Sequence, residues 1–373
     1  VVPQWHCLPA AVPQWRGLPA VEKMGNEYSV PGFHGRMRTM RMLLGLVIVL
    51  CFAGPVPAAK TLNFYFIDVE GGQATLMVTP AGQSVLVDAG WPGNNGRDAG
   101  RIAAAVKHAG LKKIDYLLVT HYHTDHVGGV PQLLAKTPVV TVIDHGPNTE
   151  TGKNPDALSK AYEEAVAKCK RIVIKRGDAL PFKGLEAKVV AARGDLIEQA
   201  LPGAGQENPL CAAERRRDED KTENARSIGF VLNYGKFRFI DLADLTWNKE
   251  LDLSCPNHKI GKIDAYLVTH HGMNMSGPAA MVHALHPRVA IMNNGAKKGG
   301  SPESFEIIRK SPGLEDLWQL HFALGAGTDR NSADSLIANT EPNCEGKWLK
   351  MTVASNGSFT VENSRNGFKK SYK

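Results

Sequence analysis

The sequence has little cysteine, no Cys-x-x-Cys spacing and no strong excess of one charge. Its 373 residues include six cysteines, and four of these lie beyond residue 59. Beyond that point 39 basic side chains stand against 35 acidic ones, and the densest basic run, residues 215–217, is followed by three acidic residues. A cysteine zinc site and a stable nucleic-acid partner are therefore not expected, whereas one or two disulfides fit an exported protein.

Long apolar runs are also scarce. The apolar run near the start, residues 43–53, is shorter than the about 20 residues that a membrane-spanning helix needs. It follows a basic stretch and precedes small residues, so residues 37–59 are interpreted as a secretory signal peptide that meets the membrane only transiently. An uncleaved anchor is the alternative. Residues 1–36 contain a near-repeat and are interpreted as translation from an upstream start codon, and we expect a periplasmic or extracellular protein.

A dense group of metal-ligand side chains follows an apolar run. Residues 114–119 have the pattern of a buried strand, and directly after them come His121, His123, Asp125 and His126. Imidazole nitrogen and carboxylate oxygen bind zinc and related divalent ions, and such a site can leave a position open for water. The ordered His-x-His-x-Asp-His spacing favours a metal site over a histidine-rich surface loop.

The same strand pattern occurs again in the second half of the chain. Residues 262–270 repeat residues 113–121, so His270 stands where His121 stands, and His271 aligns with a tyrosine. Two such strands would deliver histidines to one shared sheet edge. The repeat therefore assigns metal coordination to His270 and places His271 beside it in the pocket.

These motifs resemble those of the metallo-β-lactamase superfamily. Residues 84–90 resemble its early strand and Asp-x-Gly turn, and two glycines follow the histidine motif as in that family. Within the superfamily the chain is most similar to the hydrolase domain of the ComEC competence proteins and their secreted relatives. That closer similarity is carried by residues 66–74, 224–227 and 270–272. One departure is Gln73, which stands where the resembled pattern has an acidic residue.

The resemblance implies further ligands. A bridging aspartate is expected where the strand before the last histidine ends, and Asp244 fits that place better than Asp241, which lies within the apolar run. A third histidine for the first ion should lie between His126 and Asp244, and His145 is the only histidine in that interval. Both a ligand role and a supporting role remain open for His145.

The pattern beyond residue 59 fits one α/β domain, residues 60–373, with the four-layer αββα sandwich that the resemblance implies. Predicted helices cover residues 96–110, 155–170, 278–285 and 302–310, and predicted strands cover residues 171–175, 187–192, 228–234, 289–293 and 317–321. Residues 193–224 interrupt this alternation. They are interpreted as an exposed insertion or as a loop over the active site that helps to select substrate.

These observations predict a hydrolase with two divalent metal ions, expected to be zinc. One ion is assigned to His121, His123 and His145, the other to Asp125, His126 and His270, with Asp244 bridging them. Such ions would activate a water for attack, with Asp125 and His271 as catalytic residues. The resemblance favours phosphodiesters among small-molecule or nucleic-acid-derived substrates. A β-lactam or lactone hydrolase and a zinc-dependent binding or sensing module without turnover are the alternatives.

Overall fold

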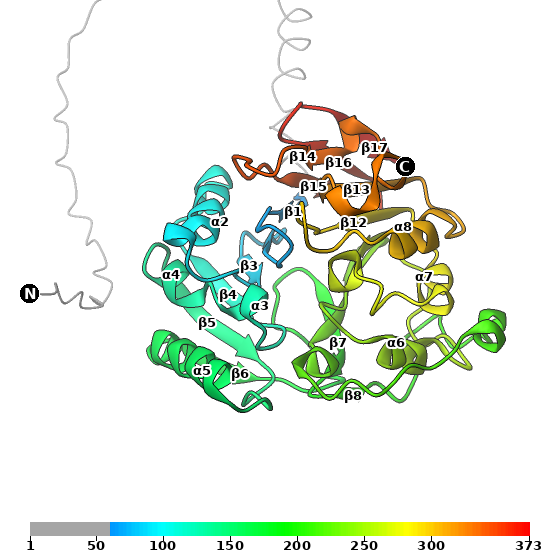
Figure 1. Cartoon of the computed structure of the whole chain (residues 1–373), viewed down its shortest axis with the longest axis horizontal. Helices are drawn as coiled ribbons and strands as arrows, with labels where there is room; N and C mark the ends of the chain where they lie inside the picture. The colour runs from blue at the N-terminus through cyan, green and yellow to red at the C-terminus, as the bar shows by residue number, and fades with distance from the viewer. Residues whose placement is uncertain (1–59) are drawn as a thin grey trace, which may run out of the picture. The chain divides into compact units, whose positions relative to one another are not determined.

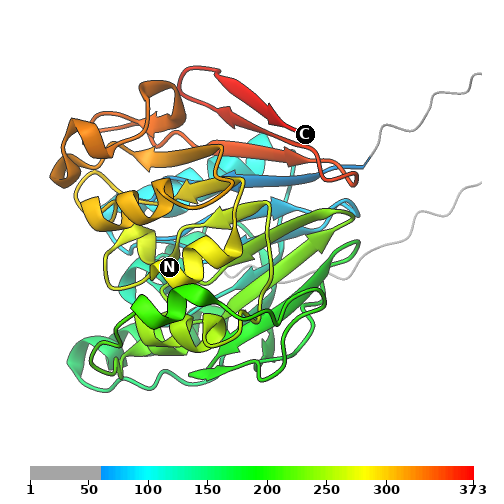
Figure 2. The ribbon, with the colours of Figure 1, turned by 90° about the vertical axis from the view of Figure 1, so that its right-hand side faces the viewer.

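The computed structural model describes residues 60–373, which form two β-sheets packed face to face with helices on both outer faces (Figure 1, Figure 2). The expected αββα sandwich is therefore confirmed. Strand alternation explains the layering, because successive side chains point to opposite faces of a sheet. In the first strand, Phe64 and Phe66 enter the core between the sheets, whereas Tyr65 packs toward the outer helices.

The described residues contain short strands interspersed with α-helices. Their bounds are β1 Leu62–Phe66, β2 Thr75–Val78, β3 Ser84–Val87, β4 Ile114–Leu118, β5 Val139–Asp144, β6 Lys170–Val173, β7 Glu186–Ala192, β8 Asp195–Leu196, β9 Gly229–Tyr234, β10 Phe237–Asp241, β11 Ala265–Leu267, β12 Val289–Met292, β13 Asp316–His321, β14 Ile337–Asn339, β15 Leu349–Val353, β16 Phe359–Asn363 and β17 Lys369–Tyr372. The α-helices are α2 Arg97–His108, α3 Thr124–Val127, α4 Val130–Leu134, α5 Lys153–Val166, α6 Trp247–Ser254, α7 Ala279–Leu285 and α8 Pro302–Arg309.

The two halves of the chain build the two sheets, with the C-terminal strands returning to the first. One sheet has the order β17-β16-β15-β1-β2-β3-β4-β5-β6, and the other has the order β14-β13-β12-β11-β10-β9-β7-β8. β4 lies parallel between β3 and β5, and β11 lies parallel between β10 and β12. Parallel strands present their carboxyl ends at one edge, so the loops after β4, β10 and β11 can converge there.

Three apolar layers hold the sandwich together. The core between the sheets includes Phe64 and Met351 from one sheet with Phe230 and Phe239 from the other. A second layer joins the first sheet to α2, α4 and α5, and a third joins the second sheet to α6, α7 and α8. Each sheet is thus buried on both faces, which leaves its end loops as the places where polar chemistry can occur.

The insertion at residues 193–224 is fastened to α6. A disulfide joins Cys211, in the 3-10 helix η2 (Pro209–Ala213), to Cys255 just after α6. The Arg217 guanidinium also lies 3.6 Å from the ring centre of Trp247. One of the one or two expected disulfides is therefore present, while Cys169 and Cys344 are free.

In the stretch from Lys60 onward, no helix is long and apolar enough to cross a membrane. The interpretations of residues 1–36 as upstream translation and of residues 37–59 as a signal peptide lie outside the described residues.

Candidate metal centre

The histidine motif folds into a single tight turn at the end of β4. His123 precedes α3, and its carbonyl oxygen accepts hydrogen bonds from the backbone N–H groups of His126 and Val127. This turn directs the ligand side chains to one side of the sheet edge. A side chain at Gly129 would clash with the backbone of Ala89, so the glycine after the motif is required for close packing.

The loops from the second half of the chain approach the same edge. Asp244 lies three residues beyond β10, and the 3-10 helix η4 (Thr269–Gly272) follows β11. Both His270 and His271 have φ of 55°, in the left-handed region, and the backbone N–H of His270 donates to the carbonyl oxygen of Ala243 over 2.8 Å. Two consecutive left-handed residues without glycine are strained, which is frequent at functional sites.

Four buried side chains bring their donor atoms together. Nε2 of His126 lies 3.2 Å from Oδ2 of Asp125, from Oδ2 of Asp244 and from Nε2 of His271. Nε2 of His271 lies 3.2 Å from Oδ2 of Asp125 and from Oδ1 of Asp244. Zinc–nitrogen and zinc–oxygen distances of about 2.0–2.2 Å imply donor separations of about 3.3–3.6 Å around a tetrahedral ion. The cluster therefore has the size and the ligand types of a divalent metal site.

Further histidines lie on the other side of Asp244. Nε2 of His121 is 3.9 Å and Nε2 of His270 is 3.4 Å from the same Oδ2 of Asp244. Nε2 of His121 is buried and has no hydrogen-bond partner within residues 60–373. The ring of His123 is 4.9 Å from that of His121, with Nε2 of His123 3.1 Å from Oε1 of Glu150. An unpaired buried imidazole nitrogen fits a second ion that shares Asp244.

Hydrogen bonds from outside the cluster orient the ligands. Nδ1 of His126 is 2.7 Å from Oδ2 of Asp88, which also accepts from the Thr120 hydroxyl over 2.6 Å. Nδ1 of His270 is 3.1 Å from the hydroxyl of Ser276. Contacts of this kind turn Nε2 toward the centre, as outer carboxylates do for metal-bound histidines in general.

The carboxylates and histidines of the cluster shift one another's pKa values. Burial opposes it, but Asp244, Asp125 and Asp88 raise the pKa of His126 well above 6.5, so a metal ion would have to displace its proton. Burial alone would raise the pKa of Asp244, but the neighbouring histidines, His270 first among them, hold it well below its ordinary value. Burial alone would also raise the pKa of Asp125, but His126, His271 and Lys298 hold it well below its ordinary value. Burial and the nearby His126 lower the pKa of His121 well below 6.5, so its nitrogen lone pair is free at neutral pH.

Two aspartates in the same loop have different surroundings. Oδ2 of Asp241 accepts a 2.7 Å hydrogen bond from Nε2 of Gln73, and Oδ1 accepts from the backbone N–H of Ala243 over 2.8 Å. Burial raises the pKa of Asp241 to about 7. Asp244 thus belongs to the cluster of donor atoms, whereas Asp241 is bonded to Gln73 and to the loop backbone. Gln73, the departure noted in the sequence, is the partner of Asp241.

The structure places His145 outside the four-residue cluster. Its Nε2 is 2.9 Å from Oε2 of Glu223, and its ring packs edge-on against Tyr122 with ring centres 5.0 Å apart. Oε1 of Glu223 also accepts from the backbone N–H and the hydroxyl of Thr149. His145 is not directed to the cluster because its imidazole pairs with Glu223, which belongs to the 3-10 helix η3 (Glu223–Arg226).

The two adjacent histidines both face Asp244. The sequence repeat assigns coordination to His270, whose Nε2 lies 3.4 Å from Oδ2 of Asp244. Nε2 of His271 lies among Asp125, His126 and Asp244. Coordination by His270 therefore stays a prediction, and the structure adds His271 to the candidate ligands.

Sequence reasoning overlooked two residues beside the centre. Lys298, in the loop after β12, forms an ion pair with Asp125 and lies 5.1 Å above the ring of Trp91. Glu150 pairs with His123 and accepts from the backbone N–H of Glu223. Neither belongs to a motif, so only their place in the fold reveals them.

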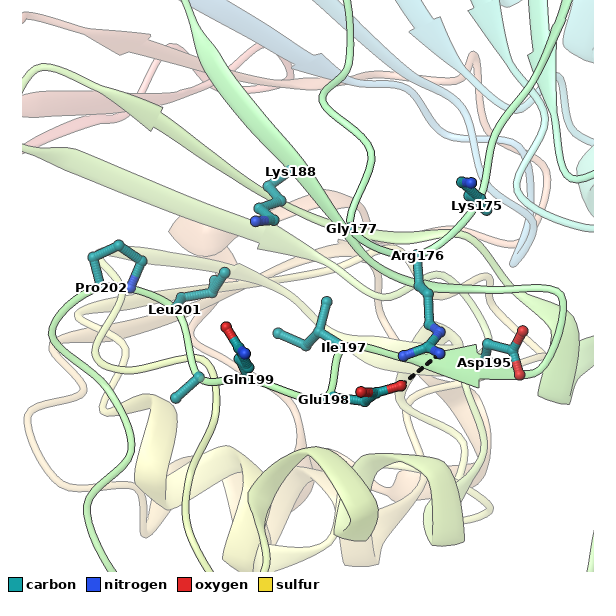
Figure 3. Close-up of a pocket in the computed structure, with 11 residues that line it drawn as sticks. Lys175, Arg176, Gly177, Lys188, Asp195, Ile197, Glu198, Gln199, Leu201 and Pro202 are labelled. Carbon is teal, nitrogen blue, oxygen red and sulfur yellow. Dashed lines mark ion pairs between the residues drawn. The ribbon is translucent and has the colours of Figure 1, made fainter.

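Grooves elsewhere do not contain the cluster. Figure 3 shows a groove of about 530 Å³ beside β7 and β8, where Arg176 and Glu198 form a 2.7 Å ion pair. None of the clustered metal-ligand residues lines it. Another groove, of about 590 Å³, lies next to the centre, and Lys298 contributes to its wall.

Part of the sequence matches known proteins. Residues 67–204 match the family described as Metallo-beta-lactamase superfamily. ComE operon protein 3 of Bacillus subtilis (strain 168) is 26% identical over 186 residues, which cover 50% of this chain and 20% of that protein. Hydroxyacylglutathione hydrolase of Rhodopseudomonas palustris (strain HaA2) is 32% identical over 117 residues, which cover 31% of this chain and 39% of that protein.

Two further similarities are broader. Lactamase-like protein nscB of Neosartorya fischeri is 25% identical over 260 residues, covering 66% of this chain and 70% of that protein. The metallo-beta-lactamase fold protein YhfI from Bacillus subtilis aligns with a TM-score of 0.42 and 11% identity. The alignment covers 69% of this chain and 95% of the YhfI chain. The chain thus contains a metallo-beta-lactamase superfamily domain, and ComE operon protein 3 is a homologue at low identity.

Proposed function

We propose that this protein is a metal-dependent hydrolase with two divalent ions, which we expect to be zinc. The observation that carries the proposal is the buried cluster of Asp125, His126, Asp244 and His271, whose donor separations suit a tetrahedral ion. The second ion would lie on the side of His121, His123 and His270, with Asp244 shared. Bound together, such ions make a water nucleophilic near neutral pH and polarise the bond under attack.

The protein's own residues would position the reactants. Asp88 fixes the ring of His126 and Ser276 fixes that of His270, so both present Nε2 to the centre. Lys298 reaches Asp125 from the groove beside the centre, where a positive side chain can bind an anionic group of the substrate. Trp91, below Lys298, offers a flat apolar surface for the rest of the molecule.

We propose phosphodiesters as the substrate class. The groove beside the centre is lined by the cationic side chains of Arg97, Arg101, Lys297 and Lys298 and by Glu70, and three of these cations also pair with nearby carboxylates. Guanidinium and ammonium groups are the usual partners of phosphate oxygens. The resemblance to the ComEC hydrolase domain points the same way, and the small net charge favours a small or nucleic-acid-derived substrate over a bound duplex.

The experiment combines metal analysis with substrate screening. The purified protein should contain divalent metal and should hydrolyse bis(p-nitrophenyl) phosphate, with activity lost on chelation and restored by zinc. His271→Ala should lack this activity. Turnover of a β-lactam, lactone or thioester without phosphodiester cleavage would instead support the alternative hydrolase, and a loaded protein that hydrolyses none of them would be a binding module.

We also propose that the protein is exported to the periplasm or the cell exterior. The disulfide between Cys211 and Cys255 supports this proposal, because such bonds persist in oxidising compartments.

A further inference from the structure

A second group of ligand-type side chains lies apart from the catalytic cluster. Asp68 and Glu70 come from the turn after β1, His321 is the last residue of β13, and Cys344 lies in the loop between β14 and β15. Asp68 and His321 are fully buried, while Glu70 and Cys344 are partly exposed. Three segments that are distant in the sequence thus bring one sulfur, one nitrogen and two carboxylates to one point.

The separations of these donor atoms, 3.1–3.5 Å, are close to the edges expected around a tetrahedral ion. Sγ of Cys344 is 3.1 Å from Oδ2 of Asp68, 3.5 Å from Oε1 of Glu70 and 3.4 Å from Nε2 of His321. Nε2 of His321 is 3.2 Å from Oδ2 of Asp68 and 3.5 Å from Oε2 of Glu70. Zinc–ligand distances of about 2.0–2.3 Å imply edges of about 3.3–3.6 Å for this donor set.

The surroundings supply the outer contacts that a metal site needs. The backbone N–H of Glu70 donates to Oδ1 of Asp68 over 2.9 Å, which leaves Oδ2 facing the other donors. Nη1 of Arg101 donates to that Oδ2 over 2.9 Å, and Nη2 donates to the carbonyl oxygen of Cys344 over 2.9 Å. Glu70 and Cys344 also line the 590 Å³ groove, which provides an access route for an ion.

We propose that Asp68, Glu70, His321 and Cys344 form a second metal site, separate from the hydrolytic centre, that binds zinc. A thiolate with an imidazole and carboxylates is a donor set that selects zinc over magnesium or calcium. The ion would join the C-terminal loop to the turn after β1. That turn continues to Gln73, whose backbone N–H donates to the carbonyl oxygen of Asp125 over 3.2 Å, so the site would brace the catalytic loop.

A metal-free cluster is the competing account. There, Arg101 and a protonated His321 would balance the two carboxylates as a buried ion-pair network, and Cys344 would stay a thiol. The two accounts differ in the state of one sulfur, which spectroscopy reports directly.

Cobalt substitution distinguishes them in the full chain. The purified protein is stripped with a chelator and reloaded with Co²⁺, because a cobalt–thiolate bond gives a ligand-to-metal charge-transfer band that nitrogen and oxygen ligands do not give. We expect this band in the wild type and in the control Cys169→Ser, and its loss in Cys344→Ser. Asp244→Asn, which damages the catalytic centre alone, should keep the band, so failure of this site and failure of the hydrolase proposal are told apart.

Zinc stoichiometry gives the second readout. Cys344→Ser and His321→Gln should each bind one zinc ion fewer per chain than the wild type and Cys169→Ser, with folding checked by circular dichroism. Cys344 is only partly buried, so its serine variant keeps the test valid if His321→Gln does not fold. Absence of the cobalt band in the wild type, or equal zinc in Cys344→Ser and the wild type, would overturn the proposal.

Discussion

Adjacent residues with the same backbone conformation hold different places in this centre. His270 and His271 share φ of 55°, yet His271 touches Asp125 while His270 is held by Ser276. Both rings reach Asp244, but Nε2 of His270 is nearest to Oδ2 and Nε2 of His271 is nearest to Oδ1. The strain is tolerated because η4 is tied to the Ala243 carbonyl.

The two neighbouring aspartates predict different variant phenotypes. Asp244→Asn should lose metal and activity, because a neutral amide cannot bridge two cations. Asp241→Asn should keep metal and lose about 1–2 kcal/mol of stability. Asp241 accepts two hydrogen bonds, and in the variant the amide NH₂ group would face one of the two donors, so that bond is lost. Metal content and urea unfolding of both variants decide the matter. If Asp241→Asn were the one that lost metal, the bridging role would belong to Asp241.

The positions of the histidines predict which alanine variants lose metal and which one keeps it. His121→Ala and His271→Ala should each reduce metal stoichiometry, and so should His270→Ala, whereas His145→Ala should retain the full complement because its imidazole pairs with Glu223. Mass spectrometry of the native proteins counts the ions. Full metal content in His271→Ala with loss in His145→Ala would reverse the ligand assignment.

The pair of His145 and Glu223 also predicts a pH dependence. Although burial opposes it, the hydrogen bond from His145 and those from Thr149 lower the pKa of Glu223 from 4.5 to about 2. A depressed folded-state pKa stabilises the protein above the unfolded value of 4.5, and that stability is lost as pH falls from 4.5 toward 2. Unfolding of chelated protein at pH 5 and pH 3 should show a smaller difference in His145→Ala than in the wild type. Equal differences would refute the coupling.

At the scale of elements, the predictable part of the site is the contiguous part. His121 to His126 lie on one turn, so their spacing alone indicates a metal site. His271 and His126 are 145 residues apart in the sequence, and their rings are in contact because the loop after β11 packs against the turn after β4. A repeat of strand sequence locates those loops but not the backbone angles within them. Lys298 and Glu150 were missed for the same reason, because their roles come only from tertiary packing.

The helices and strands themselves follow local signals closely. The predicted helix at 302–310 is α8, where Ser301 accepts from the backbone N–H of Ser304 and Pro302 occupies the first turn. The predicted strand at 187–192 is β7, which begins one residue earlier. Apolar alternation and capping residues act over a few positions, so the sequence contains the information for these boundaries.

The insertion predicts a stability contribution from its disulfide. Cys211 and Cys255 are 44 residues apart, and a crosslink over such a loop stabilises the folded state by about 4 kcal/mol in the chain-entropy model. Replacing both with serine should lower the free energy of unfolding by a comparable amount, and Cys169→Ser should not. Urea titrations of the three proteins provide the comparison. Equal stability of the double variant and the wild type would show that the contacts of Arg217 with Trp247 suffice.

At the scale of the whole molecule, the two sheets depend on each other and on the C-terminal strands. β1 pairs with β15, so the first strand and the last hairpin are hydrogen-bonded neighbours. The hydroxyl of Tyr234, in the other sheet, donates to the carbonyl oxygen of Lys60 over 2.5 Å. The chain from Lys60 to Tyr372 therefore closes the sandwich.

This closure predicts where the mature protein begins. Residues 60–373 contain every strand of both sheets, Lys60 is exposed, and β1 starts at Leu62, so the predicted cleavage position precedes the sandwich. We expect protein from the native host to begin near Lys60, and we expect residues 60–373 produced alone to match the full chain in metal content and urea midpoint. Mass spectrometry of the intact protein recovered from the native host tests the first point. A retained apolar segment would indicate a membrane anchor, and a less stable 60–373 fragment would mean that the preceding residues contribute to the fold.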